Sequence, residues 1–232
     1  MIKKFKLYHF PATRSARVKW ALHETIGDEF EVEKVQLYQG AQYSKAYLAK
    51  NPNHNVPLLE ITLEDGTVKR MIESVAMVQW LVDAFPEKQL APAPDLSWER
   101  ADYLQMLHFG ATWMDMMLWQ VRIHEHILPP EECDSRTVQR YREKFVNEVE
   151  PQLKNRLGQT AYICGENFSG ADIVIGHNVT WARGYKLCQD DVFREYLSRV
   201  SKRPAFQKAF ADAREFSPVV PNREGSKANF SG

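Results

Sequence analysis

KKFKLYHFPATRSARVKWALHETI, the stretch from residue 3 to residue 26, carries the pattern that decides the fold. Lysine alternates with apolar residues over 3–9, which predicts a half-buried strand that ends before Pro11. Over 15–26 the apolar side chains recur every three or four residues on one helical face, and Gly27 is placed to end that helix. The chain is therefore predicted to open with a strand followed directly by a helix.

The next segments continue the alternation of strand and helix. Residues 30–37 return to a period of two and predict a second strand, and 41–49 is compatible with a helix. Two β-prone runs flank Asp65-Gly66, and this dipeptide is the strongest short signal for an antiparallel hairpin. With a helix predicted for 74–84, residues 1–85 form an α/β domain.

A proline-rich segment separates this domain from the rest of the chain. Residues 86–95 hold three prolines and are interpreted as a linker. From 96 to 218 the chain shows helical periodicity and few strand signals, which predicts an all-α C-terminal domain. Residues 219–232 lack periodicity and are interpreted as a terminal tail.

Composition and charge argue against several functional classes. The chain of 232 residues has 30 basic and 30 acidic side chains, so no net field attracts nucleic acid or an anionic membrane. No apolar run is long enough for a signal sequence or a membrane span. The widely spaced Cys133, Cys164 and Cys188 predict neither a disulfide framework nor a cysteine-built zinc site. We expect a soluble cytoplasmic protein with no nucleic-acid and no membrane partner.

Four strings, in this order along the chain, resemble the cytosolic glutathione transferases. They are FPATRSARVKWAL at 10–22, NPNHNVPLL at 51–59, MIESVAMVQWL at 71–81 and GENFSGADIVIGHN at 165–178. The resemblance, to bacterial-type or theta-like members with a serine or threonine active-site loop, implies a thioredoxin-like N-terminal domain and an all-α C-terminal helical domain. It also implies glutathione as co-substrate, a small-molecule electrophile as second substrate, a detoxification role and a homodimer.

Thr13 and Ser15 are the candidate catalytic residues, in the loop after the first strand. Glutathione chemistry requires the thiolate, and a thiol with a pKa of about 8.5 is only a few per cent ionised at pH 7. A hydroxyl donor at a helix N-terminus favours the anion through its hydrogen bond and the helix dipole. The resemblance places Thr13 where theta-like members carry their serine, so we rank Thr13 first and Ser15 second. In the alternative interpretation Ser15 caps the helix and Thr13 satisfies a loop amide.

The same loop holds one candidate contact and lacks one residue type. Arg14 could contact the glutathione peptide or a substrate anion, and a solvated surface arginine is the alternative. Positions 11–16 contain no cysteine. This absence disfavours the omega-like and beta-like classes, which form mixed disulfides through a cysteine in this loop.

The segment before the third strand is the second candidate contact with glutathione. The resemblance implies that Val56 offers its backbone amide and carbonyl to the peptide and that Pro57 is cis. Many members carry glycine and then lysine before this valine, whereas this chain has His54 and Asn55. A neutral hydrogen bond from Asn55 is the expected replacement for the usual charged contact.

Glu73 and Ser74 begin the helix after the fourth strand. A helix N-terminus with a free hydroxyl is a natural site for a carboxylate. The resemblance implies that Ser74 takes the carboxylate of the γ-glutamyl group and that Glu73 approaches its ammonium group. An ordinary helix cap is the alternative interpretation.

The helical domain holds the candidate pocket for the second substrate. Trp113, Met116 and Met117 follow at helical spacing, on the long helix that family members use to wall this pocket. Soft side chains of this kind suit a range of apolar electrophiles, and plain core packing is the alternative. Ser169 and Asp172 form a variant of the capping box and are assigned a structural role.

Metal binding is not predicted. His124 and His126 are spaced i, i+2, so they point apart on a helix, and no carboxylate completes a ligand set with them. The expected function is transfer of glutathione to an electrophile. A glutathione-dependent disulfide reductase or peroxidase on the same fold, and a non-catalytic binding protein, are the alternatives.

Overall fold

A four-stranded mixed sheet forms the N-terminal part of the computed structural model, which describes residues 1–219. The strand order is β2-β1-β3-β4, with β1 at Ile2–His9, β2 at Glu31–Lys34, β3 at Leu58–Leu63 and β4 at Val68–Met71. β1 pairs parallel with β2 and antiparallel with β3, and β3 and β4 form the predicted hairpin. All but one residue of the predicted tail, 219–232, lies outside the described residues.

The register of the strands brings three loops to one end of the sheet. Tyr8 at the end of β1 pairs with Leu58 at the start of β3, and Leu59 pairs with Met71 at the end of β4. The segments that follow β1, precede β3 and follow β4 therefore meet at this end of the sheet. These are the segments that contain the glutathione-site candidates of the N-terminal part.

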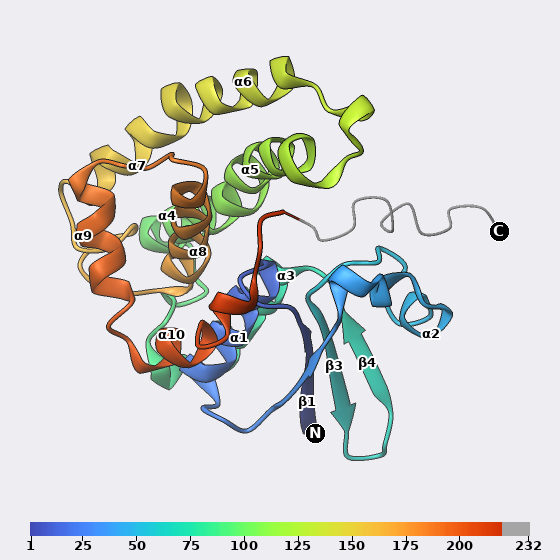
Figure 1. Ribbon diagram of the computed structural model, residues 1–232. Helices are drawn as coiled ribbons and strands as arrows, with labels where there is room; N and C mark the ends of the chain where they lie inside the picture. The colour runs from blue at the N-terminus through green and yellow to red at the C-terminus, as the bar shows by residue number, and fades with distance from the viewer. Residues whose placement is uncertain (220–232) are drawn as a thin grey trace.

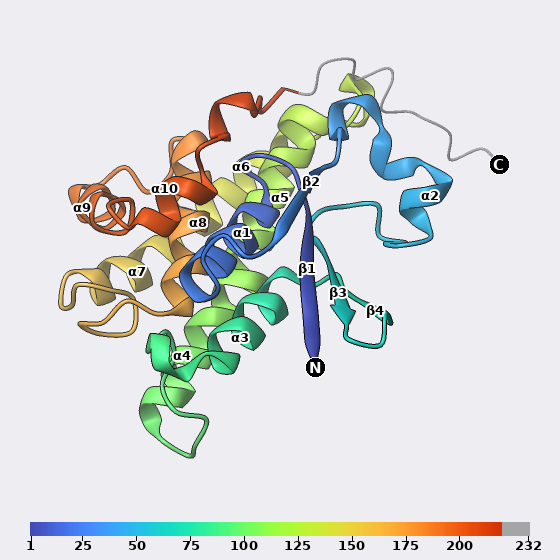
Figure 2. The ribbon, with the colours of Figure 1, turned by 90° about the horizontal axis from the view of Figure 1, so that it is seen from below.

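Two helices lie between the sheet and the helical part of the chain. They are α1 at Arg14–Thr25 and α3 at Ser74–Ala84, and both confirm the sequence predictions. Figures 1 and 2 show both helices on the side of the sheet that faces the helical part, and the short α2, Lys45–Leu48, on the other side. The order β1, α1, β2, α2, β3, β4, α3 is that of the predicted thioredoxin-like unit.

The segment between β2 and β3 differs from its prediction. β2 ends at Lys34, and two short 3₁₀ turns, Leu37–Gln39 and Ala41–Tyr43, replace the end of the predicted strand and the start of the predicted helix. Gly40 between them has a φ of +73°, in the left-handed region, so a regular element cannot run through it. The predicted helix is reduced to α2, which Ser44 caps through the amide of Tyr47.

The rest of the described chain is helical, as predicted. Two long helices contain π-helical turns. α4 runs through the turn Gly110–Met114 into α5, which continues into a second turn at Ile123–Ile127, and α6 runs through the turn Phe145–Val149 into α7. α8, α9 and α10 follow. Their bounds are α4 Trp98–Phe109, α5 Asp115–Arg122, α6 Ser135–Lys144, α7 Glu150–Leu157, α8 Gly170–Gly184, α9 Asp191–Val200 and α10 Pro204–Ala209. None of the helices in residues 1–219 is long and apolar enough to cross a membrane.

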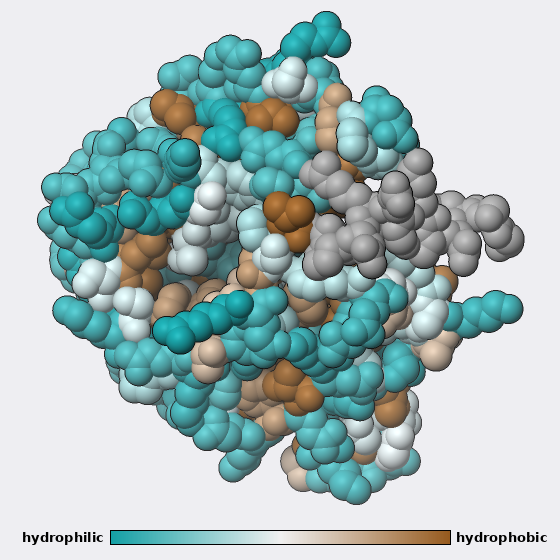
Figure 3. Space-filling view, in the orientation of Figure 1, coloured by the Kyte–Doolittle hydropathy of each residue, from teal (hydrophilic) through white to brown (hydrophobic). Residues whose placement is uncertain are grey.

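Two apolar clusters lie on opposite faces of the sheet. The larger one includes Leu7 and runs through α1 and α3 into the helical part, so it is continuous across the proline-rich segment. The smaller one includes Tyr8 and packs under the segment between β2 and β3. Adjacent residues of β1 thus serve different cores, as strand geometry requires. The outer surface seen in Figure 3 is mostly hydrophilic, with small separate apolar patches.

The predicted capping box is present at the start of α8. Asp172 accepts from the backbone amide of Ser169, and both halves of the reciprocal box are formed. The carboxylate also accepts from the amide of Ile163 and the hydroxyl of Tyr196, both at 2.9 Å. Burial raises the pKa of Asp172 to about 6, against the effect of these donors. The box therefore anchors α8 in the core, as the structural interpretation predicted.

Candidate functional site

The loop between β1 and α1 is closed by hydrogen bonds to Phe10. Its carbonyl accepts from the amide of Thr13 at 3.4 Å and lies 2.8 Å from the Thr13 hydroxyl and 3.0 Å from the Ser15 hydroxyl. Its amide donates to Ser15 Oγ at 3.0 Å. Ala12 has a φ of +53°, a left-handed conformation that turns the chain back on itself. The N-terminus of α1 is thereby held at the end of β1.

The two candidate hydroxyls have different surroundings. Ser15 is completely buried, and its oxygen lies 2.7 Å from His9 Nδ1 and 2.8 Å from Thr13 Oγ1. The structure does not support Ser15 as a contact for a bound thiol, because its hydroxyl is enclosed by protein atoms. Thr13 is only half-buried and caps α1 by accepting from the amide of Ser15. Thr13 is therefore the hydroxyl better placed to reach a ligand.

A buried histidine extends this network to the C-terminal end of the described chain. His9 Nε2 lies 3.1 Å from Oδ2 of Asp212, which follows α10 and also accepts from Lys19 at 2.9 Å. Burial lowers the pKa of His9 below its ordinary value, although Asp212 opposes this shift. The ring is thus neutral at pH 7. Because a carboxylate can only accept, Nε2 carries the ring proton and Nδ1 accepts from the Ser15 hydroxyl.

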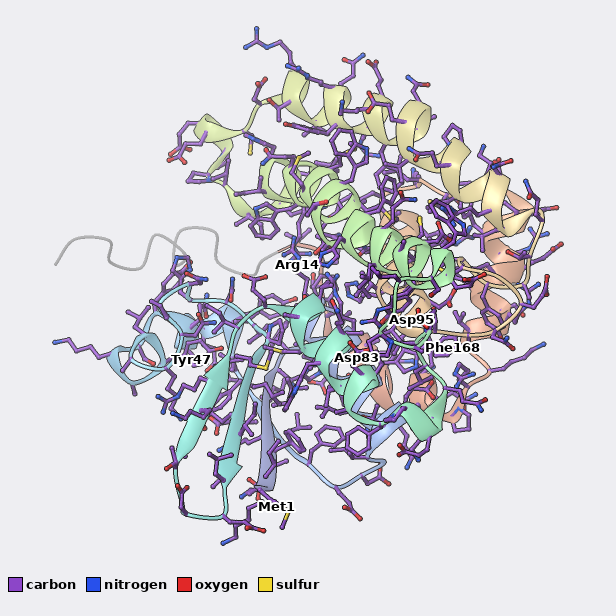
Figure 4. The ribbon with its side chains drawn as sticks, turned by 180° about the vertical axis from the view of Figure 1, so that it is seen from behind. Met1, Arg14, Tyr47, Asp83, Asp95 and Phe168 are labelled. Atoms are coloured by element: carbon purple, nitrogen blue, oxygen red, sulfur yellow. The ribbon has the colours of Figure 1, made fainter. Side chains whose placement is uncertain are left out.

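Arg14 lies at the junction between the sheet part and the helical part, as Figure 4 shows. Its Nε donates to Asp115 of α5 at 2.7 Å, and its guanidinium lies over the rings of Trp119 and Trp181, 5.4 and 5.0 Å from their centroids. The expected contact between Arg14 and glutathione is not supported, because the side chain is already held by these groups. It is not a solvated surface residue either.

A second arginine of α1 pairs with the same carboxylate. Arg17 is completely buried and donates to both oxygens of Asp115, at 3.0 and 2.7 Å. Burial alone would raise the pKa of Asp115, but the charges of Arg17 and Arg14 outweigh it, so that pKa lies below its usual range. The carboxylate is charged at neutral pH and fixes α1 against α5.

The loop is also fixed from the side of α8. His177 is buried, and its Nε2 lies 3.0 Å from the carbonyl of Thr13. The next residue, Asn178, donates to the carbonyl of Gly110 in the π-helical turn at 2.8 Å. Burial lowers the pKa of His177 to about 3, so the ring is neutral and donates through Nε2. α8 thus positions the backbone of the candidate catalytic residue.

The segment before β3 presents the backbone that the sequence analysis singled out. The Val56–Pro57 peptide bond is cis. The carbonyl of Asn55 accepts from Tyr47 and Asn51, and the side-chain oxygen of Asn55 also accepts from Asn51. Among residues 1–219, neither the amide nor the carbonyl of Val56 has a hydrogen-bond partner. Asn55 is thus occupied through both oxygens, and Val56 has both backbone groups available.

Glu73 and Ser74 stand at the N-terminus of α3. Glu73 is exposed, whereas Ser74 is buried to 7% exposure as the first residue of the helix. Glu73 makes no side-chain cap, so the described residues leave the first amide groups of α3 without that partner. This end of the helix therefore offers hydrogen-bond donors beside one free carboxylate.

The three candidate pocket residues on α5 and the π-helical turn before it do not share one environment. Trp113 is 36% exposed and lies under the ammonium group of Lys144, whereas Met116 is partly buried. Met117 has no exposed surface and belongs to the main core. The expectation that Met117 walls a pocket is not supported, because its side of the helix faces the core.

The last described residues lie across the smaller apolar cluster. Phe216 packs against that cluster, and the guanidinium of Arg122, at the end of α5, lies 4.7 Å from the centre of its ring. Ser217 exchanges two hydrogen bonds with the hydroxyl of Tyr38, at 2.7 and 2.8 Å. The chain end therefore contacts both the helical part and the segment between β2 and β3.

Sequence reasoning missed His9, Asp115, His177 and Asp212. An acidic residue between methionines in an apolar stretch could have indicated a buried partner at Asp115. The other three depend on contacts between distant segments and left no local signal. Within residues 1–219, no group of three or more His, Cys, Asp or Glu side chains could hold a metal ion.

Comparison with known proteins decides the family. The sequence profile described as "Glutathione S-transferase, N-terminal domain" matches residues 3–83. The chain is 30% identical over 215 residues to glutathione S-transferase GstA of Escherichia coli O157:H7, covering 89% of this chain and 97% of that protein. The chain belongs to the glutathione S-transferase family.

Two further relatives place it within this family. It is 27% identical over 216 residues to the disulfide-bond oxidoreductase YfcG of Escherichia coli K12, covering 89% of this chain and 94% of that protein. A solved glutathione transferase of Methylococcus capsulatus has a TM-score of 0.75 at 27% identity, covering 91% of this chain and all of that one (100%). The predicted combination of a thioredoxin-like domain and a helical part is confirmed as the fold of this family.

The buried ion pair gives a testable expectation for stability. We expect Asp115→Asn to lower the free energy of unfolding by about 3 kcal/mol, because it leaves Arg17 buried beside a neutral partner. Urea unfolding followed by circular dichroism measures this difference. Asp28→Asn, which alters an exposed ion pair with Lys208, should leave the transition midpoint unchanged. Equal midpoints for both variants would contradict the proposed importance of the buried pair.

The neutral state of His177 predicts a pH dependence. Its pKa is about 3 in the folded protein against an ordinary 6.5, so the unfolded chain binds the extra proton as the pH falls below 6.5. This histidine should therefore cost the wild type about 2 kcal/mol of stability between pH 7 and about pH 5, and His177→Gln should abolish that part of the loss. Urea titrations at the two pH values test this. The exposed His108, changed to Gln, is the control; identical pH slopes in all three proteins would refute the expectation.

Proposed function

We propose that this member of the family is a glutathione transferase that activates the glutathione thiolate for attack on a small, largely apolar electrophile. The observation that carries the proposal is the backbone of Val56, which has no hydrogen-bond partner among residues 1–219 and lies beside a hydroxyl-bearing helix N-terminus at the same end of the sheet. An extended peptide pairs with an unpaired amide and carbonyl of this kind. Glutathione is such a peptide, and it also carries the thiol that the reaction needs.

The γ-glutamyl end of glutathione fits the start of α3. Its carboxylate suits the N-terminal amides of this helix, where the dipole favours negative charge. Its ammonium group suits Glu73, which is exposed and whose side chain caps no amide of α3. Ser74 and Glu73 thereby recognise one end of the peptide, and Val56 recognises its middle.

This binding mode brings the cysteine thiol toward the N-terminus of α1. The helix dipole and the Thr13 hydroxyl both favour the thiolate over the thiol. To donate to sulfur, Thr13 must turn its only proton away from the interior, where the Phe10 carbonyl and Ser15 Oγ each lie 2.8 Å from its oxygen. A thiolate held in this way is the nucleophile, and the reaction needs no covalent bond to the protein.

The second substrate would lie on the helical side of the site. Trp113 is 36% exposed, and the rings of Trp119 and Trp181 both lie against the Arg14 guanidinium, with their centroids 5.4 and 5.0 Å from it. Aromatic walls with one cationic group suit an apolar electrophile from which an anionic group leaves. We propose Trp113 and Met116, without Met117, as residues of this wall, and a homodimer as the working form.

A disulfide reductase is the second candidate, favoured by the similarity to YfcG. Loop positions 11–16 hold no cysteine, so the disulfide chemistry would pass between two glutathione molecules. Turnover of chlorodinitrobenzene against hydroxyethyl disulfide, each with glutathione, separates the candidates. We expect the aryl halide to be the better substrate by at least about tenfold in kcat/KM. A preference for the disulfide would contradict the transferase assignment and assign the protein as a disulfide reductase.

The role of Thr13 is tested by the ionisation of bound glutathione. We expect the pKa of the thiol in the wild-type complex to lie well below that of free glutathione, and Thr13→Ala to raise it by about 1–2 units. Thr13→Ser should keep the low value because it keeps the hydroxyl. The ultraviolet absorbance of the thiolate, followed against pH, measures each value.

The control for this titration is Thr67→Ala, in the hairpin turn at the opposite end of the sheet. It should behave as the wild type does. Binding of glutathione with an unshifted thiol pKa in the wild type would favour a non-catalytic binding protein. A Thr13→Ala complex with the wild-type value would exclude Thr13 as the hydroxyl.

A further inference from the structure

The hydroxyl of Thr13 stands at one end of a continuous chain of hydrogen bonds through the buried interior. Thr13 Oγ1 lies 2.8 Å from Ser15 Oγ, Ser15 Oγ lies 2.7 Å from His9 Nδ1, and His9 Nε2 lies 3.1 Å from Asp212 Oδ2. Ser15 and His9 have 0% and 1% exposure. Solvent is therefore excluded from the middle of the chain, and only its Thr13 end faces the proposed site.

We propose that this chain is a proton relay, in which His9 accepts the thiol proton of bound glutathione through Ser15 and Thr13. The inference rests on the proposed function, because it requires a thiol at Thr13. As the sulfur–hydrogen bond breaks, its proton passes to Thr13 Oγ1, the proton of Thr13 passes to Ser15 Oγ, and that of Ser15 passes to His9 Nδ1. The products are a thiolate and an imidazolium, with no change in the total charge or in the number of protons.

The directions of the hydrogen bonds support this order. The carboxylate of Asp212 fixes the ring proton on Nε2, so Nδ1 is an acceptor and the Ser15 proton points toward it. Ser15 can then accept from Thr13 but cannot donate to it. The proton of Thr13 therefore points inward in the resting protein, and Thr13 Oγ1, which already accepts from the Ser15 amide, has one lone pair left to receive the proton of a thiol.

After the transfer, every bond direction is reversed. Imidazolium Nδ1 donates to Ser15, the Ser15 proton turns toward Thr13, and the Thr13 proton turns toward the thiolate. The carbonyl of Phe10 does not need either hydroxyl proton, because it accepts from the backbone amide of Thr13 at 3.4 Å. Charging the ring thus supplies the outward-pointing donor that the thiolate needs.

The charges around His9 fit an acceptor that takes a proton only when an anion forms nearby. Asp212 favours the imidazolium, whereas Lys19 of α1 and Lys34 of β2 oppose it, and burial disfavours the charged ring. A thiolate at Thr13 adds one negative charge on the other side of the ring. Because His9 acts through two hydroxyls and does not touch glutathione, it is a positioning residue and not a catalytic one.

The destination of the proton distinguishes a relay from simple hydrogen bonding. Glutathione is mixed with the full chain in weakly buffered solution at neutral pH, while thiolate absorbance and released protons are recorded together. In the wild type we expect fewer than about half of the thiolates formed to release a proton, because His9 retains it. His9→Asn keeps an acceptor for Ser15 but no base, so it should release about one proton per thiolate, with a thiol pKa higher by about one unit or more.

Two controls complete this experiment. His23→Asn removes a histidine at the far end of α1 and should retain protons as the wild type does. Asp212→Asn leaves His9 in place but removes the partner of the imidazolium, so it should release protons as His9→Asn does. Thiolate formation with one proton released in the wild type would overturn the relay alone, whereas absence of thiolate would overturn the proposed function and the relay with it.

A spectroscopic measurement on the wild type covers the case in which the variants do not fold. The nitrogen resonances of His9 should change from the neutral ring protonated at Nε2 to the imidazolium when glutathione is added. S-methylglutathione, which has no thiol proton, should leave the neutral ring unchanged. A neutral His9 in the glutathione complex, with thiolate present, would refute the relay.

Discussion

The buried ion pair between Arg17 and Asp115 is the constraint on which the rest of the molecule depends. It joins the helix that follows the first strand to the start of α5, far along the chain, in a place where Arg17 is fully buried and Asp115 is only 6% exposed. A pair of this kind adds little net stability but penalises every arrangement that separates its members. Because Arg14 shares the same carboxylate, the pair also fixes the side on which α1 presents its N-terminus. The relative position of the sheet and the helical part, and therefore of the two sides of the site, follows from this one carboxylate.

The site itself is a consequence of strand order. The antiparallel pairing of β1 with β3 and of β3 with β4 brings the end of one strand beside the start of another, so segments from three parts of the sequence meet at one edge. Each segment contributes a different kind of group: a hydroxyl at a helix N-terminus, a free backbone pair at Val56, and a carboxylate beside a second helix N-terminus. In the proposed function, the thiol, the backbone and the zwitterionic end of glutathione each meet one of these three groups.

Local signals predicted much of the fold, and contacts at long range explain what they missed. The hairpin at Asp65-Gly66, the exact bounds of α3 and the capping box at Ser169 depend on neighbouring residues, so the sequence contained the information. The predicted strand at 30–37 is longer than β2 because the chain turns away from the sheet before Gly40. Hydrophobic periodicity carries no signal for such a turn. The prediction that Met117 lines a pocket is not supported. Helical spacing identifies residues that share a helix face, but it does not say which of them the core covers. His9 and Asp212 are 203 residues apart, and nothing short of the folded chain brings them together.

The end of the described chain links the end of α5 to the segment between β2 and β3. Phe216 packs in the smaller apolar cluster beneath the segment between β2 and β3, while Arg122 of α5 covers its ring, and Ser217 is held by Tyr38. Any movement of α5 away from the segment between β2 and β3 breaks at least one of these contacts. The residues after α10 therefore connect α5 to the segment between β2 and β3, and they follow the same turn that places Asp212 against His9.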